Sequence, residues 1–245
     1  MPRFDAAYVP ASAMTVFAHP DDAEFIVSGT VAKWARAGCE VTFVVLTNGN
    51  VGTHDPTFTL EELSRTRQEE QRAAARVLGV KNVVFLGYDD CELVATLELR
   101  RRLVREIRRF RPEVLVCGDP QAYFFDDRYI NHPDHRAAAE AALGAVFPCA
   151  EMELLWPEEG PAHKPLAVYV CATHSPNTWI DITDTIDVKI ESLRAYGSQV
   201  GNWDPSERIR ERAGREAKEA RKSGRGGPSR YTEAYRVMRI HQEDE

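Results

Sequence analysis

Polar, chemically capable residues in this chain come directly after short apolar runs, and this order constrains the fold more than any other feature. The apolar runs at 14–18, 41–46, 83–86 and 114–117 alternate with longer amphipathic stretches. Such alternation is typical of a parallel sheet covered by helices. The sequence therefore predicts an α/β fold, a Rossmann-like three-layer sandwich with a mostly parallel sheet and helices on both faces.

The longer stretches predict helices at about 20–37, 60–78, 96–110, 133–146 and 187–196, with further strands near 167–171 and 179–182. Hydrophobic residues make up 43% of the chain and charged residues 28%, as in an ordinary globular protein. We expect one domain over 1–245.

Charge and composition exclude several classes of protein. The net charge of −7 argues against a nucleic-acid binder, since phosphate neutralisation needs a basic surface. We expect no membrane association, because no run approaches the length of a spanning helix. Five cysteines without a C-x-x-C pair, and an N-terminus unlike a signal peptide, favour a cytoplasmic protein.

The segment 205–230 departs from this balance, with nine Lys and Arg residues against four Glu. It ends in the sequence KSGRGGPSR, a composition typical of a mobile segment. We predict a basic flexible segment within the single domain. It is either a solvated helix followed by a loop, or an active-site lid or subunit contact.

The polar clusters gather at one edge of the predicted sheet. In doubly wound sheets, ligands bind beyond the carboxyl ends of the strands. The first strand runs into 19–22 (HPDD), the second into 47–50 (TNGN), and the fourth is followed by 131–135 (NHPDH). Asn48 in the second cluster either donates to a substrate hydroxyl or serves the turn. No G-x-G-x-x-G follows the first strand, which disfavours a dinucleotide enzyme.

The two H-P-D segments share one layout. Proline is favoured at the first position of a helix, so Pro20 and Pro133 are each predicted to open one. Either segment alone is compatible with an ordinary acidic helix start. Both together, each after a buried strand of one sheet, favour a metal site.

Catalytic zinc sites use three protein ligands from His and carboxylate side chains. His19 and Asp22 are three residues apart and can converge on one ion, which His135 can reach from the neighbouring turn. We predict these three as the metal ligands. Asp21 is then placed to act as the general base for the attacking water.

The second segment supplies the opposite side of the predicted site. His132 stands at the start of its helix, and Asp134 is close enough in sequence to orient it or to charge it. A protonated His132 can stabilise an oxyanion or protonate a leaving amine.

These residues resemble the LmbE-like, or PIG-L, family of zinc-dependent de-N-acetylases. The resemblance rests on 18–24 (AHPDDAE) and 132–135 (HPDH), and on 66–70 (TRQEE). It extends to 193–199 (LRAYGSQ) and 233–236 (EAYR).

The resemblance implies a zinc-dependent hydrolase that removes an N-acetyl group from a GlcNAc-type amino-sugar conjugate. It implies the same ligands and the same base, with Arg67 contacting the sugar and Tyr129 helping the oxyanion. It also implies a small-molecule substrate and a homo-oligomer, in some members a hexamer. Ferrous iron is an alternative occupant of the same ligands.

Three alternatives remain at this stage. A related metal-dependent amidase acting on another N-acyl substrate would use the same machinery. A non-haem iron oxygenase also uses two histidines and a carboxylate, although short alternating strands would then be expected. A non-catalytic binding module is disfavoured by Asp21, which stands beside the ligands without being one.

Overall fold

The structure, a computed structural model, describes residues 5–225 and 227–240. Its strands are β1 (Ser12–Phe17), β2 (Glu40–Thr47), β3 (Asn82–Tyr88), β4 (Val114–Cys117), β5 (Phe124–Phe125), β6 (Tyr129–Ile130), β7 (Ala167–Cys171), β8 (Thr178–Asp181) and β9 (Thr232–Arg239). Its α-helices are α1 (Asp22–Ile26), α2 (Ser28–Arg36), α3 (Leu60–Leu78), α4 (Leu97–Phe110), α5 (Pro133–Val146), α6 (Ile186–Arg194), α7 (Gly197–Val200) and α8 (Ser206–Lys222). Two short 3-10 helices cover Cys149–Glu151 and Pro157–Glu159.

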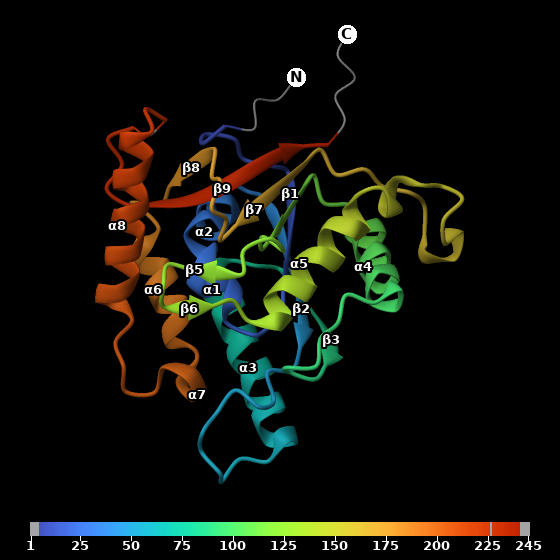
Figure 1. The fold of residues 1–245 in the computed structure, drawn as a ribbon, viewed down its shortest axis with the longest axis horizontal. Coiled ribbons are helices and arrows are strands. Elements are labelled where there is room, and N and C mark those ends of the chain that lie inside the picture. Colours follow the sequence, from blue (N-terminus) through green and yellow to red (C-terminus); the bar gives the residue numbers. More distant parts are fainter. Residues whose placement is uncertain (1–4, 226, 241–245) are drawn as a thin grey trace.

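A seven-stranded sheet in the order β3-β2-β1-β4-β7-β9-β8 forms the centre of the molecule (Figure 1). The first five strands of that order are parallel, whereas β9 is antiparallel to both of its neighbours. Helices cover both faces, so the predicted three-layer α/β fold is confirmed. Within the described ranges, no helix is both long and apolar enough to cross a membrane.

Each face of the sheet has its own hydrophobic core. On one face, side chains from α1, α2, α3, α6 and α8 pack on the sheet, with Trp34 edge-on to Tyr169 at 5.4 Å between ring centroids. On the other face, α4 and α5 contribute Leu103, Ile107 and a row of alanines. Each Å² of apolar surface that is buried stabilises the fold by about 25 cal/mol. These two hydrophobic layers are therefore the main stabilising contribution.

Local sequence signals set the ends of the longer helices. Thr59 and Glu62 form a capping box at the start of α3, and Gly79 ends that helix with a left-handed φ of 78°. Thr96 accepts a hydrogen bond from the backbone of Leu99 at the start of α4. The helices predicted at 60–78, 96–110 and 133–146 are confirmed to within one residue.

The helix predicted at 20–37 is wrong in two respects. The chain forms two helices, α1 and α2, separated at Val27, and the first begins at Asp22 rather than at Pro20. Asp21 has a φ of 96°, which a helical residue cannot adopt. This left-handed residue shapes the site described below.

Most of the basic segment 205–230 is the helix α8, which packs against the sheet through Ile209, Ala213 and Ala217. The strand β9 follows it and had no counterpart among the predicted strands. It inserts between β7 and β8, which carries α8 to the carboxyl edge of the sheet.

Candidate metal centre

The turn after β1 points two neighbouring carboxylates in different directions. Asp22 turns back toward β1, where its Oδ2 accepts a hydrogen bond from the backbone N–H of His19 at 2.9 Å. The left-handed φ of Asp21 sends that carboxylate toward α3 instead. Aspartate tolerates this conformation better than most residues. One carboxylate is therefore available as a ligand, and the other stands beside the ligands.

His19, Asp22 and His135 form a compact triangle of donor atoms. His19 Nδ1 lies 3.2 Å from His135 Nε2 and 3.5 Å from Asp22 Oδ2, and His135 Nε2 lies 3.1 Å from Asp22 Oδ1. Donors at zinc-ligand distances around a tetrahedral ion are about 3.3 Å apart. The donor types and their spacing fit a divalent cation.

Both histidines have a hydrogen-bond partner on the ring nitrogen that faces away from this triangle. His19 Nε2 lies 2.9 Å from Asp90 Oδ1 and 3.2 Å from Asp134 Oδ2. His135 Nδ1 lies 3.1 Å from Asn131 Oδ1. Histidine ligands in metal sites donate their second N–H to such acceptors, which fixes the tautomer. His19 Nδ1 and His135 Nε2 are then the free donors.

A second group, formed by His19, Asp90, His132 and Asp134, is also compact enough to hold an ion. The carboxylate of Asp134, however, already accepts hydrogen bonds from the backbone N–H groups of Cys91, at 2.8 Å, and Leu93, at 3.3 Å. Its oxygens also face His19. We therefore assign this group to the support of His19.

The charge around His19 favours a bound cation. Burial lowers the pKa of His19, but hydrogen bonds to Asp134, Asp22 and Asp90 raise it to about 12. In the same way, burial lowers the pKa of His135 and Asp22 raises it, with a net increase. The carboxylates that raise the pKa of these two imidazoles place negative charge around them. The same negative charge would stabilise a bound metal ion.

Asp21 is held by Arg67, which the sequence analysis placed at the sugar. Arg67 is buried, with 3% of its surface exposed. It donates to Asp21 Oδ2 at 2.9 Å, to the carbonyl of Pro20 at 2.6 Å and to the carbonyl of Gly49 at 3.0 Å. Burial raises the pKa of Asp21 to about 7, although the guanidinium of Arg67 lowers it. Both terminal nitrogens of the guanidinium are thus hydrogen-bonded to the protein, whereas Nε has no partner among the described residues.

His132 is the N-cap of α5, as predicted from Pro133. Its Nδ1 accepts a hydrogen bond from the backbone N–H of Asp134 at 3.2 Å, so its Nε2 carries the proton. Nε2 lies 3.7 Å from the sulfur of Cys91. Burial lowers the pKa of His132, and the charge of His19 lowers it further. The carboxylate of Asp134 is 4.0 Å from His132 Nδ1 and is bonded to other groups.

The other two residues predicted to bind substrate lie on the loop after β2 and on the β5–β6 hairpin. Asn48 donates to the carbonyl of Gly87 and accepts from Gln68, each at 3.3 Å. Tyr129 is half-exposed in the hairpin of β5 and β6. Burial raises the pKa of its hydroxyl, and the charge of Asp22 raises it further, as expected for a hydroxyl close to the triangle.

Two supporting residues were not predicted. Asp90 was not among the residues singled out from the sequence, and Asn131 appeared only as the neighbour of His132 in the segment 131–135. A signal was available for each. Asp90 comes just after β3, a strand of the sheet, and Asn131 directly precedes the second H-P-D segment.

The fold and the site together define an α/β protein with a two-histidine, one-carboxylate metal centre at the carboxyl edge of its sheet. Comparison with known proteins identifies the family. The model of the PIG-L family, described as GlcNAc-PI de-N-acetylase, matches residues 14–146, and the chain belongs to this family. The family is metal-dependent, in agreement with the triangle.

Individual relatives are similar over most of their length. The chain is 35% identical to a diacetylchitobiose deacetylase of Thermococcus kodakarensis over 196 residues, which cover 76% of this chain and 71% of the relative. It is 28% identical to a probable N-acetyl-alpha-D-glucosaminyl L-malate deacetylase 2 of Bacillus anthracis, covering 76% and 80%.

Solved structures show the same architecture. An N,N'-diacetylchitobiose deacetylase from Pyrococcus horikoshii superimposes with a TM-score of 0.85 at 28% identity, covering 96% of this chain and 88% of that one. The 4-carboxy-2-hydroxymuconate hydratase GalB of Pseudomonas putida gives a TM-score of 0.76 at 25% identity, covering 96% and 97%. The scaffold is thus shared by hydrolases and by a hydratase.

Proposed function

We propose that this protein is a metal-dependent N-deacetylase that hydrolyses the acetamide of a GlcNAc-type amino-sugar conjugate. The observation that carries the proposal is the triangle of His19, Asp22 and His135 with the carboxylate of Asp21 beside it, in a chain of the PIG-L family. Two relatives named as amino-sugar deacetylases support the substrate class.

The metal ligands in this proposal are His19, Asp22 and His135, and zinc is the proposed ion. A divalent cation held there supplies Lewis acidity, which polarises an amide carbonyl and acidifies water. Zinc is favoured by the mixture of imidazole and carboxylate donors, and ferrous iron fits the same set.

The remaining steps belong to side chains of the chain itself. Asp21 accepts the proton of the attacking water, and Arg67 holds its carboxylate in place. His132, whose Nε2 carries a proton, donates a hydrogen bond to the oxyanion, and the proton that Asp21 has accepted passes to the departing amine. Asp134 acts by positioning His19, since its oxygens face that ring. Tyr129 and Asn48 are proposed to contact the substrate from the surrounding loops.

The experiment is a comparison of wild type with Asp21→Asn and His135→Ala. Each protein is purified, its metal is quantified, and acetate release is measured with N-acetylglucosamine and N,N'-diacetylchitobiose. We expect Asp21→Asn to retain metal and to lose about 10²- to 10⁴-fold in rate, the range of general-base catalysis. His135→Ala should lose the metal. Full activity in Asp21→Asn would refute the assigned base.

The amidase alternative is tested in the same assay. One relative, 29% identical over 180 residues, is a mycothiol S-conjugate amidase of Streptomyces coelicolor. Bound metal without acetate from any amino sugar, together with cleavage of another N-acyl substrate, would favour that activity. The iron oxygenase gains no support, because the sheet is mainly parallel.

We further propose that the protein is a homo-oligomer, as the resemblance implies. Light scattering of the eluting peak in size-exclusion chromatography measures the molar mass directly. A mass of 27.6 kDa, that of one chain, would refute this proposal.

A further inference from the structure

Both polar groups of the peptide unit that precedes Asp21 are hydrogen-bonded to the helix α3. Arg67 and Gln71 are separated by one turn of α3, so their side chains project from the same face of that helix. Arg67 donates to the carbonyl of Pro20 at 2.6 Å, and Gln71 Oε1 accepts from the backbone N–H of Asp21 at 3.3 Å. One helix therefore fixes the plane of this peptide unit.

The peptide unit that follows Asp21 is fixed as well. The carbonyl of Asp21 accepts a hydrogen bond from the backbone N–H of Phe25 at 3.0 Å. Between these two units, Asp21 has a φ of 96° and a ψ of −23°. A residue with a side chain adopts the left-handed region at a cost in free energy, and it stays there only where its surroundings hold it. The two fixed peptide units hold Asp21 there and set the direction of its carboxylate.

The amide group of Gln71 is oriented by Glu24 of α1. Gln71 Nε2 donates to Glu24 Oε1 at 2.8 Å, and both side chains are buried. A carboxyl oxygen at this distance requires the NH₂ end of the amide, because that end is the donor. The carbonyl end of Gln71 is then turned to the N–H of Asp21, which needs an acceptor.

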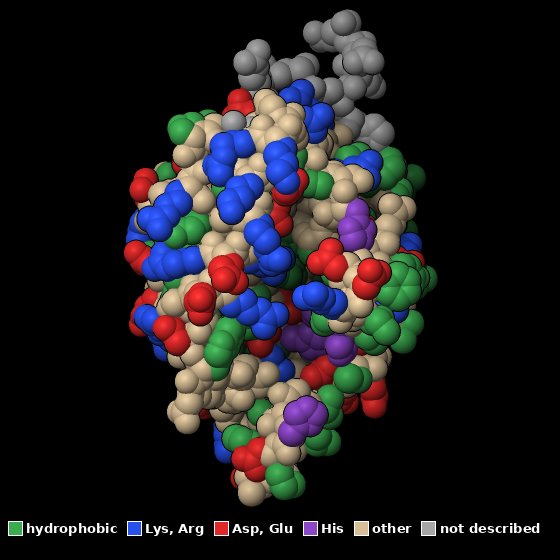
Figure 2. All heavy atoms as spheres, turned by 60° about the vertical axis from the view of Figure 1, so that its left-hand side comes forward, with side chains coloured by type: hydrophobic (Ala, Val, Ile, Leu, Met, Phe, Trp, Pro, Cys, Tyr) green, Lys and Arg blue, Asp and Glu red, His purple; other side chains and the backbone are tan. Residues whose placement is uncertain are grey.

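Gln71 is shielded from the solvent side of the site. Histidine side chains are visible in a hollow of the molecular surface (Figure 2), and a substrate reaches them from solvent. The side chain of Gln71 is bonded to Asp21 and Glu24, and only 1% of the residue is exposed. An effect of Gln71 on the reaction must therefore pass through Asp21.

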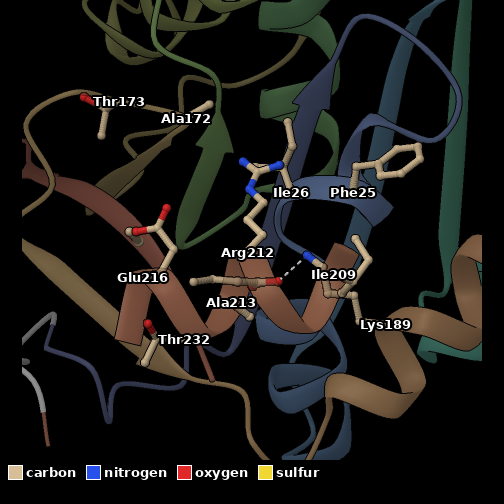
Figure 3. A pocket seen from close by; sticks show the side chains of 12 residues that line it. Phe25, Ile26, Ala172, Thr173, Lys189, Ile209, Arg212, Ala213, Glu216 and Thr232 are labelled. Atoms are coloured by element: carbon tan, nitrogen blue, oxygen red, sulfur yellow. Dashed lines mark hydrogen bonds and ion pairs between the residues drawn. The ribbon is translucent and has the colours of Figure 1, made fainter. Parts of the chain in front are cut away.

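Another side of α1 is less closely packed. Phe25 and Ile26 of this short helix lie in the wall of a cavity of ≈ 50 Å³ between α1 and α8 (Figure 3). Side chains that line a cavity lack packing partners on that side. The hydrogen bonds from α3 therefore contribute more to fixing the turn at Asp21 than they would in a close-packed setting.

We propose that Gln71 is a positioning residue for the general base, acting through the backbone of Asp21, with Glu24 fixing its amide. The inference rests on the proposed function. Without the acceptor at Gln71, the peptide unit before Asp21 is held only at its carbonyl, and the turn relaxes from the left-handed region. The carboxylate then moves away from the attacking water. A displacement of about 1 Å costs up to about 100-fold in rate.

The test measures kcat and KM for acetate release from N,N'-diacetylchitobiose, together with metal content. Gln71→Met removes both hydrogen bonds at similar length, and we expect kcat to fall about 10- to 100-fold with KM and metal content unchanged. The control is Leu78→Ala, which deletes a buried side chain two turns further along α3. It should lower stability and leave kcat unchanged. Gln71→Asn, one methylene too short for both contacts, serves as the second variant if Gln71→Met does not fold.

A double-mutant cycle shows whether Gln71 acts through the base. In the Asp21→Asn background, Gln71→Met should not reduce the residual rate further, because the carboxylate that it positions is already absent. The same fold-loss in both backgrounds would overturn the proposal. An unchanged kcat in Gln71→Met would overturn it as well.

Hydrogen exchange at the backbone amide of Asp21, observed by NMR, does not depend on catalysis. Relative to the amides of the central sheet, this amide should exchange faster in Gln71→Met than in wild type or Leu78→Ala. If no substrate yields acetate, the proposed function fails, and the exchange rates still decide whether Gln71 holds the turn. Equal relative exchange in all three proteins would show that it does not.

Discussion

Removal of the Arg67 side chain should destabilise the protein through the carboxylate that it leaves behind. In Arg67→Ala, Asp21 loses its cationic partner, and the carbonyls of Pro20 and Gly49 lose a donor. Breaking a buried ion pair by removing one partner costs about 3–5 kcal/mol. For a chain of this size that lowers Tm by about 6–20 °C.

A double-mutant cycle separates this pair from general effects of packing. Unfolding by urea is measured for wild type, Arg67→Ala, Asp21→Asn and the double variant, with the metal removed by a chelator. If the two side chains support each other, Arg67→Ala costs at least about 1 kcal/mol less in the Asp21→Asn background. Arg65→Ala, an exposed arginine of the same helix, should change stability by less than about 0.5 kcal/mol.

The kinetics of Arg67→Lys test whether the contact between Arg67 and Asp21 matters for catalysis. Lysine keeps the charge but cannot reproduce the planar fork that reaches three acceptors. If Arg67 positions the base, kcat falls while KM stays near the wild-type value. A higher KM with unchanged kcat, together with no coupling in the cycle, would show that Arg67 binds the sugar and that the reasoning from its burial is wrong.

Two further predictions concern the buried carboxylates of Asp134, in the site, and Glu159, outside it. Asp134→Asn should weaken metal binding about 10- to 100-fold, because the carboxylate that orients His19 is lost. Competition with a chelating indicator measures the metal affinity. An unchanged affinity would contradict the role assigned to Asp134. At Glu159, the hydrogen bond from Arg105 lowers the pKa to about 2, and Arg101 acts in the same direction. The ionised Glu159 carboxylate therefore stabilises the folded state. This stabilisation is fully present above the unfolded pKa of about 4.3 and is lost as pH falls toward 2. Glu159→Gln should therefore cost about 1–2 kcal/mol at pH 7 and progressively less below pH 4.5, as followed by urea unfolding; an equal cost at all pH values would exclude the charge as its cause.

The metal ligands could be predicted because all three lie in the two short segments 19–22 and 132–135, each of which leads into a helix. His19 and Asp22 follow β1 directly, and His135 lies at the start of α5, so the topology of a parallel sheet brings them to one edge. Proline at 133 fixed the start of α5 correctly. These signals are local in sequence, and local signals can be recognised without coordinates.

The contacts that support the ligands could not be predicted in the same way. Arg67 and Asp21 are 46 residues apart, and nothing in a charged helix distinguishes the one arginine that turns inward. Asp90 faces His19 while its neighbour Asp89 accepts a hydrogen bond from Asn50, and nothing local in the sequence distinguishes the two. The start of α1 was wrong for a related reason, because the left-handed backbone of Asp21 depends on a partner in another helix.

The distribution of charge in the site limits how a sugar can be recognised. The carboxylates of Asp22, Asp90 and Asp134 surround His19, and a divalent cation would offset most of their charge. Asp21 and Arg67 neutralise each other. No charged group of this buried layer is left over for a neutral sugar.

Recognition must therefore come from the loops above that layer. Asn48 lies on the loop after β2 and Tyr129 on the hairpin after β4, and both are at least partly exposed. Loops of this kind vary without disturbing the packed elements that hold the ligands. A change of substrate within this family then requires changes in these two loops and none in the metal triangle. Exchanging both loops for those of a relative should alter which acetylated sugar is cleaved while metal content stays the same.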